Sequence, residues 1–206
     1  MTYSTLAVGS LAALRSALDG GIFADVGDGD TLIVPTAAAF TGAAEAAIAV
    51  SQALDGTGLH LEGLMVTDRP SAAEAHFVRR IGECDLVILC DGSALHARTV
   101  WRDTPFGESL RAARRLVAIG SVATVLGDVM IDPRGGAPTT GLGYRPGVAM
   151  CAGESDELLE RTRTLLQPDV ALAAIGPMGV LGHDGTRWHV VVDDVLVTRG
   201  HEYVRL

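Results

Sequence analysis

The sequence of 206 residues contains no lysine and no asparagine, so all sixteen of its basic residues are arginine. Without lysine, the chain cannot form a Schiff base with a substrate and cannot build a Walker-type phosphate loop. The composition therefore excludes two large classes of enzyme chemistry before any motif is considered.

Basic residues are also fewer than acidic ones, 16 against 25, so the formal net charge is −9 at pH 7. Such an acidic chain is a poor partner for nucleic acids and for anionic membrane surfaces. No apolar run reaches the roughly 18 residues needed to span a bilayer, and no basic segment precedes an apolar one. We therefore expect a soluble, cytoplasmic protein with no nucleic-acid or membrane partner.

The chain has only three cysteines, Cys84, Cys90 and Cys151, which lie in or beside apolar segments. Their odd number and their spacing favour buried free thiols over disulfides or metal ligands. The His183-Asp184 pair and His189 are only weak evidence for a metal, and we interpret them as loop and strand residues. We expect no metal and no cofactor.

Hydrophobic residues make up 48% of the chain, enough for the core of a single domain over residues 1–206. Short apolar runs alternate with segments of helical periodicity, which predicts a flavodoxin-like α/β fold: a three-layer sandwich with a mainly parallel central sheet and helices on both faces. Leu86–Leu89 and Leu116–Ile119 are uninterrupted apolar runs, which predicts two adjacent central strands. The alternating segment 187–200 predicts a C-terminal β-hairpin around Asp193-Asp194.

The remaining elements follow from apolar runs and helix-capping residues. Further strands are predicted at Leu6–Val8, Asp30–Pro35, Leu61–Val66 and Val170–Ile175. Helices are predicted from Ser10 to Gly20, Thr41 to Leu54, Ser71 to Cys84 and Glu154 to Leu166. Ser10 and Thr41 are expected N-caps, and Ser71 with Glu74 has the spacing of a capping box.

Small polar residues follow the two central runs. Since the carboxyl ends of parallel strands meet at one edge, where ligands bind in open α/β sheets, these residues predict a pocket. An arginine further along the chain is expected to meet a carboxylate there. The predicted pocket residues are Asp91, Gly92, Ser93, Gly120 and Arg145, with Ser121 beside them.

The order and spacing of these motifs resemble the cyanophycinase and dipeptidase E family of serine peptidases, within the class I glutamine amidotransferase-like superfamily. The resemblance extends from about Leu6 to Gly200. Family members usually carry a G-G-G/D-x loop, a G-x-S-A-G-A nucleophile elbow and a G-L-G-x-x-P-G segment. This chain has Cys90–Ser93, Ile119–Thr124 and Gly141–Gly147 at those places.

The resemblance implies Ser121 as the nucleophile, at the start of a helix from Val122 to about Val129. If the elbow is aligned on its helix side instead, the register shifts by one and Gly120 takes the nucleophile position. A third interpretation is that Ser121 only caps the N-terminus of the following helix. A β-branched residue directly after the serine fits a sharp elbow poorly.

The other two members of the catalytic triad are missing from the places that the resemblance implies. Gly153 stands at the histidine position, and the turn 176–179 offers Met178 or glycine in place of a carboxylate. Because the loss of triad members removes most of the rate enhancement, ordinary family catalysis is not expected.

Substitute residues stay open as alternatives. His96 lies five residues after Asp91 and could approach Ser121, or could simply be a surface histidine. Cys90 could be an activated thiol at a helix start or, as we favour, a core residue. The segment from Arg134 to Thr140 predicts a flexible polar loop that could order over a small ligand.

Two function classes therefore remain. The favoured class is a non-catalytic protein that binds a small molecule or a peptide, or that assembles, for instance as a homodimer. The alternative is a serine-type hydrolase acting on a peptide or amide bond through a site rebuilt around Ser121, Asp91 and His96.

Overall fold

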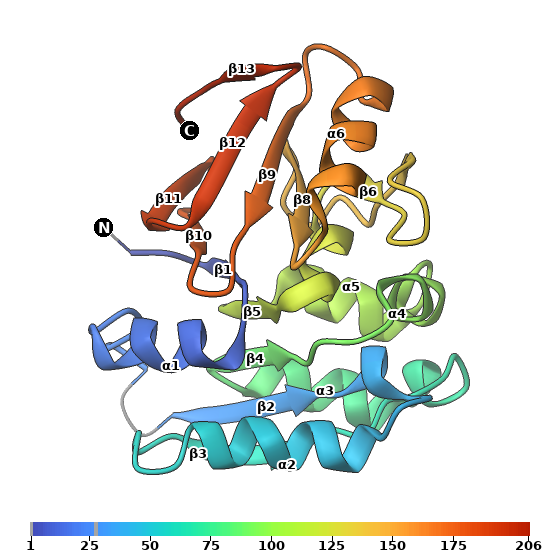
Figure 1. The fold of residues 1–206 in the computed structure, drawn as a ribbon. Coiled ribbons are helices and arrows are strands. Elements are labelled where there is room, and N and C mark those ends of the chain that lie inside the picture. The colour runs from blue at the N-terminus through green and yellow to red at the C-terminus, as the bar shows by residue number, and fades with distance from the viewer. Residues whose placement is uncertain (1, 27–28) are drawn as a thin grey trace.

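The computed structural model describes residues 2–26 and 29–206. It shows an α/β fold in which a mixed central sheet is flanked by helices and a smaller second sheet lies beyond one edge of it (Figure 1). The central sheet has, in spatial order, β11 (Trp188–Val192), β10 (Val180–His183), β1 (Thr5–Val8), β5 (Leu116–Ile119), β4 (Leu86–Leu89), β2 (Asp30–Val34) and β3 (His60–Gly63).

The middle of this sheet is parallel, as its apolar sequence predicts. β4 and β5 are adjacent, with Val87 opposite Leu116, and every residue of both strands is buried. Parallel pairing continues from β5 to β1 and from β4 through β2 to β3. Strands covered on both faces need apolar side chains on both faces, which explains their uninterrupted runs.

The sheet becomes mixed beyond β1, because β10 pairs antiparallel to it, with Val8 opposite Val180. β11 then pairs antiparallel to β10. A β-hairpin in the C-terminal part of the chain thus covers the edge of β1.

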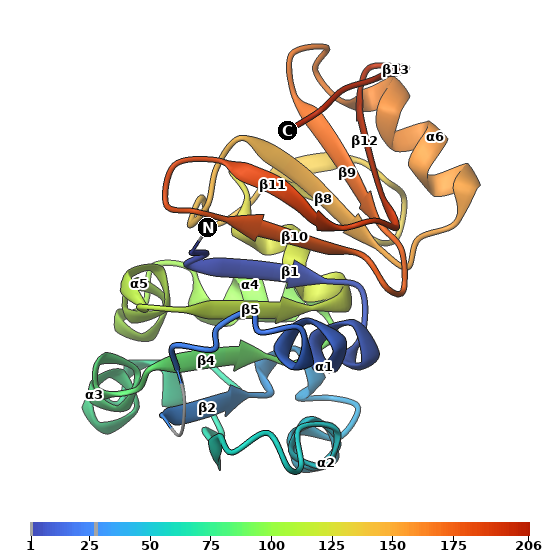
Figure 2. The ribbon, with the colours of Figure 1, turned by 90° about the vertical axis from the view of Figure 1, so that its left-hand side faces the viewer.

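Helices cover both faces of the central sheet (Figure 2). Helices α1 and α2 pack on one face and helices α3 to α5 on the other, so that each face has its own buried cluster. The bounds are α1 (Leu11–Asp19), α2 (Ala43–Ala53), α3 (Ala75–Glu83), α4 (Ala94–Trp101) and α5 (Pro105–Ala112).

Of the predicted helix caps, the first is confirmed, since the Ser10 hydroxyl accepts a hydrogen bond from the Ala13 amide at 3.2 Å. The other two are wrong. Gly42 precedes α2, and Thr41 instead donates its hydroxyl proton to the Ala38 carbonyl. Ser71 opens a separate 3-10 turn, η2 (Ser71–Ala73), and its hydroxyl binds Asp68. The capping box is therefore absent from α3.

The second sheet was not predicted as a separate layer. Its strands are, in spatial order, β13 (Glu202–Tyr203), β12 (Val195–Arg199), β9 (Ala171–Ile175) and β8 (Val148–Ala152). β8 and β9 are parallel, whereas β12 runs antiparallel to β9 and to β13. Helix α6 (Asp156–Leu165) packs on one face of this sheet (Figure 1).

The C-terminal hairpins are present, but the pairing predicted for 187–200 is wrong. β11 pairs with β10 of the central sheet, and β12 pairs with β9 of the second sheet. Asp194, with a φ of +89°, redirects the chain between them. Alternation identifies half-buried strands but not their partners, and β11 and β12 belong to different sheets instead of pairing with each other.

Two further predictions about elements need correction. The strand predicted to reach Val66 is β3, which ends at Gly63. The helix predicted from Val122 to Val129 is a 3-10 helix, η3 (Gly120–Leu126), followed by β6 (Val129–Ile131). Because β-branched residues crowd a helical turn, the run of valine and threonine disfavours an α-helix here.

The predicted polar loop after β6 is partly ordered. Its end forms β7 (Pro138–Thr140), which pairs with β6. Arg134 lies in the turn between the two strands, where its guanidinium binds Asp132 at 2.9 Å. No helix in the described parts of the chain is long and apolar enough to cross a membrane.

Candidate functional site at the carboxyl edge of β4 and β5

Gly120 occupies the sharp turn that follows β5. Its φ of +63° lies in the left-handed region, which glycine adopts without steric cost. A Cβ built on Gly120 would lie 2.4 Å from Cγ of Asp91. The carboxylate of Asp91 therefore fills the space that a side chain at position 120 would need.

Asp91 is held there by three hydrogen bonds to a single oxygen. Its Oδ1 accepts the backbone N–H of Gly92 at 2.7 Å, the backbone N–H of Ser121 at 2.8 Å and the Ser121 hydroxyl at 2.9 Å. Two backbone donors from neighbouring strand ends, aimed at one point, form the kind of arrangement that stabilises an oxyanion. In this chain the donors are satisfied by the protein's own carboxylate.

Ser121 lies at the start of η3 and makes no hydrogen bond to an imidazole among the described residues. Its hydroxyl donates to Asp91, and no side-chain cap bond begins η3. Ser121 is therefore neither paired with a histidine base nor a simple N-cap.

His96 faces a different segment. Its Nε2 donates to the Thr67 carbonyl at 2.8 Å, and its ring packs edge-on against Phe40, with 4.5 Å between the ring centroids. Ser93 begins α4, and its hydroxyl accepts the His96 amide at 3.3 Å. The predicted approach of His96 to Ser121 is thus not present.

Gly92 and Ser93 join Asp91 at this edge because the loop is pressed against η1 (Thr36–Ala38). A Cβ on Gly92 would lie 2.4 Å from the Ala37 carbonyl oxygen, and the Ser93 amide donates to that same oxygen at 2.7 Å. Backbone contact with η1 therefore fixes the path of the chain from Asp91 into α4.

Arg145 does not belong to this site. Its Nε donates to the Thr5 hydroxyl at 2.8 Å, and Thr5 pairs with Leu116 at the opposite end of β5. At about 3.3 Å per residue, this end lies roughly 13 Å from the Gly120 turn. Burial lowers the pKa of Arg145, whose other donors reach the carbonyls of Arg111 and Tyr144.

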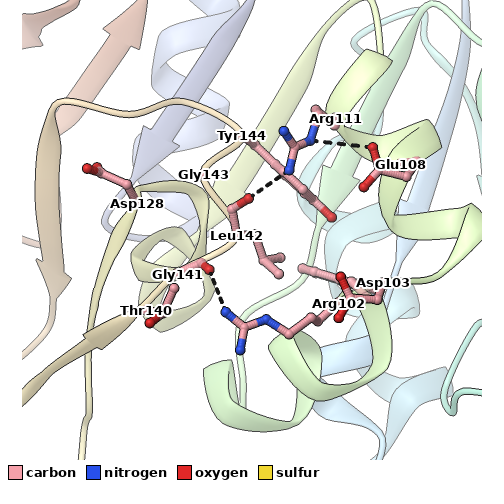
Figure 3. A pocket seen from close by; sticks show the side chains of 11 residues that line it. Arg102, Asp103, Glu108, Arg111, Asp128, Thr140, Gly141, Leu142, Gly143 and Tyr144 are labelled. Atoms are coloured by element: carbon pink, nitrogen blue, oxygen red, sulfur yellow. Dashed lines mark hydrogen bonds and ion pairs between the residues drawn. The ribbon is translucent and has the colours of Figure 1, made fainter.

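The segment matching G-L-G-x-x-P-G has a structural role in this chain. It lines a cavity of about 290 Å³ beside α4 and α5 (Figure 3). Arg102 donates to the Gly141 carbonyl and Arg111 to the Leu142 carbonyl, so both arginines of the cavity wall hold the backbone of this segment. Arg111 also pairs with Glu108 at 3.6 Å.

Gly153 lies just past the end of β8 with a φ of +73°, and a Cβ there would meet nothing within 4 Å. The turn 176–179 lacks a carboxylate of its own, but Asp194 supplies one from the link between β11 and β12. Its Oδ2 accepts the Met178 amide at 2.9 Å. Sequence reasoning missed Asp194, because no spacing signals a contact made across 16 residues.

The buried thiol of Cys90 and the Asp184 cluster lie apart from the Asp91 site. Cys90 is buried, and burial raises the pKa of its thiol to about 12, which corrects the alternative of an activated thiolate. Hydrogen bonds from Thr186 and His189 lower the pKa of Asp184 in the β10–β11 turn. Among the described residues, no group of three or more His, Cys, Asp or Glu side chains could hold a metal.

Comparisons with known proteins bear on the fold. No family model matches the chain, and no curated protein matches its sequence. A solved peptidase from an acI-B1 actinobacterium is similar, with 22% identity, a TM-score of 0.76, and coverage of 100% of this chain and 94% of that one. A candidate peptidase E from Listeria monocytogenes is also similar, with 12% identity, a TM-score of 0.65, and coverage of 97% and 99%. The chain therefore has a peptidase E-like fold.

Proposed function

We propose that this chain is a catalytically degenerate protein of peptidase E-like fold, which binds a small molecule or a peptide without cleaving it. The observation that supports this most directly is the Gly120 turn. A nucleophile elbow presents its side chain from a sharp turn after a strand. The residue in that turn has no side chain, and the Asp91 carboxylate lies in its place.

The surroundings of the turn support the same proposal. The two backbone donors that could stabilise an oxyanion already bind Asp91. Gly153 brings no imidazole to the end of β8. A hydrolase needs a nucleophile, a base and free oxyanion donors together, and all three are compromised here.

One contact favours the alternative of a serine-type hydrolase, namely the hydrogen bond from the Ser121 hydroxyl to Asp91 at 2.9 Å. The accepting oxygen also binds two backbone N–H groups, so it is already shared among three donors. The contact therefore serves better to hold Asp91 than to activate Ser121.

A fluorophosphonate probe and a panel of dipeptides, including aspartyl dipeptides and β-aspartyl-arginine, separate the two functions. We expect neither labelling nor turnover above that of Ser121→Ala, with an active serine peptidase as the positive control. Ser51→Ala, which removes an exposed serine of α2, controls for nonspecific labelling. Turnover that is lost in Ser121→Ala would overturn the proposal. Turnover that survives Ser121→Ala but is lost in Cys90→Ala or His96→Ala would overturn it equally.

A further inference from the structure

A groove of about 640 Å³ lies on the second sheet beside the start of α6. Its floor is a row of apolar residues on three neighbouring strands. Cys151 of β8 stands opposite Ala174 of β9, which stands opposite Leu196 of β12. Leu159 of α6 closes one side, and Leu196 remains 40% exposed. The groove thus offers an unfilled apolar surface to a ligand.

The charged groups of the groove all have one sign. Glu154, Asp193 and Asp194 line it, and no arginine or histidine does so among the described residues. Asp194 is fixed by the Met178 amide. Glu154 and Asp193 have neither a hydrogen bond nor an ion pair with any residue that the structure describes.

Some carboxylates elsewhere on the surface are paired with arginine. Glu62 and Asp85, for example, each bind an arginine, Arg80 and Arg114. In the groove, burial raises the pKa of Glu154, with no cation to oppose the effect. The three carboxylates place negative charge beside an apolar floor, where a cation is attracted more strongly than it would be in bulk water.

The groove also belongs to the edge that carries the Asp91 site. Val8 at the end of β1 pairs with Ile119 at the end of β5, so Gly9 and Gly120 follow neighbouring strands. Gly9 is packed against Gly176, since a Cβ on Gly9 would lie 1.8 Å from the Gly176 carbonyl oxygen. The turn 176–179, which borders the groove, therefore packs against the end of β1. Since β1 pairs with β5, this turn lies one strand away from Gly120.

We propose that this groove binds an organic cation whose charged head is an amine, amidinium or guanidinium group and whose body is apolar. The head lies among Glu154, Asp193 and Asp194, and the body covers the floor around Leu196. The same carboxylates disfavour acidic ligands. This inference deepens the proposed function, because it gives the binding protein a ligand class.

Benzamidine and benzamide test the charge requirement, because they have nearly the same shape and differ in charge. By titration calorimetry we expect benzamidine to bind at least tenfold more tightly than benzamide. Glu154→Gln and Asp193→Asn should each weaken benzamidine binding several-fold. Glu157→Gln, which removes an exposed charge of α6 outside the groove, should leave the affinity unchanged.

A second variant tests the location without changing charge. Leu196→Trp enlarges an exposed side chain on the floor, so it should fold normally and block benzamidine. Equal affinity for the two probes, undetectable benzamidine binding, or an affinity indifferent to Glu154→Gln and Leu196→Trp would overturn the proposal. These outcomes would leave the absence of hydrolysis standing, whereas turnover dependent on Ser121 would overturn the proposed function and leave the cation preference intact.

Discussion

Asp91 and Gly120 fit together across two neighbouring strand ends: the carboxylate of Asp91 lies where a side chain on Gly120 would have to be. A Cβ at position 120 would be 2.4 Å from Asp91 Cγ and 2.5 Å from each of its oxygens. The residues come from the ends of β4 and β5, which are paired in the middle of the sheet. Any side chain at position 120 must therefore displace Asp91 from its three hydrogen bonds.

This relationship predicts that Gly120→Ala destabilises the fold through Asp91. A left-handed φ costs alanine about 1–2 kcal/mol, and the loss of the Asp91 hydrogen bonds adds about 1–3 kcal/mol. Gly56→Ala is the matched control, because Gly56 has a φ of +76° and open space around it. In urea unfolding, Gly120→Ala should lower the free energy of unfolding more than Gly56→Ala does. The double variant Gly120→Ala/Asp91→Ala should lose less free energy of unfolding than the sum of the losses of the two single variants. Strict additivity would contradict the displacement.

Arg145 should contribute to stability and not to ligand binding. Arg145→Met removes hydrogen bonds to Thr5, Arg111 and Tyr144, which we expect to cost about 2–4 kcal/mol in urea unfolding. Arg134→Met removes an exposed arginine that pairs with the neighbouring Asp132, so its cost should stay below about 1 kcal/mol. Similar losses for the two variants would contradict the structural role of Arg145.

The three cysteines should be unreactive in the folded protein. Burial raises the pKa of Cys84 to about 11 and those of Cys90 and Cys151 to about 12. At pH 7.5 the thiolate fraction is then very small, and access is blocked as well. Mass spectrometry should find no alkylation by iodoacetamide in buffer and three alkylated sites in guanidinium chloride. Rapid labelling of Cys90 in buffer would show that the edge of β4 opens.

Glu154→Gln should stabilise the protein at neutral pH. Because burial raises the pKa of Glu154 in the folded state, protonation favours folding. That contribution is complete below the unfolded pKa of about 4.3 and is lost as the pH rises through the folded pKa. We expect a gain below about 1 kcal/mol at pH 7, since water still screens this side chain, and none at pH 4. Glu202→Gln, at an exposed position of β13, should leave the free energy of unfolding unchanged at both pH 7 and pH 4. A gain of equal size at both pH values would exclude the titration of Glu154 as its cause.

The sequence predicted the parts of the fold that rest on local pattern. Leu86–Leu89 and Leu116–Ile119 are central because a strand covered on both faces has few alternatives to an apolar run. The alternating segment 187–200 does form strands, but alternation carries no information about pairing, and the second sheet arises from contacts between distant segments. The α-helix expected after Ser121 was wrong, because the β-branched residues there disfavour an α-helix and the segment forms a 3-10 helix.

The candidate site was predicted in part for the same reason. Asp91 and Ser121 come together because strand order places their turns side by side. A sequence argument does not determine where side chains point. His96 and Arg145 were expected at this site, but His96 binds Thr67 and Arg145 binds Thr5. The placement of Gly120 in the elbow depends on a backbone angle, which the motif left open between two registers.

The link between β11 and β12 has a consequence for how the molecule loses its structure. The chain crosses between the two sheets at 176–179 and again at 193–194, and these crossings are bonded to each other. The Gly176 amide donates to the Asp194 carbonyl at 2.7 Å, and the Met178 amide to its carboxylate at 2.9 Å. These bonds couple the two sheets, because unfolding of either sheet strains the turns that both sheets share. Thermal denaturation should therefore be a single cooperative step, with equal calorimetric and van't Hoff enthalpies.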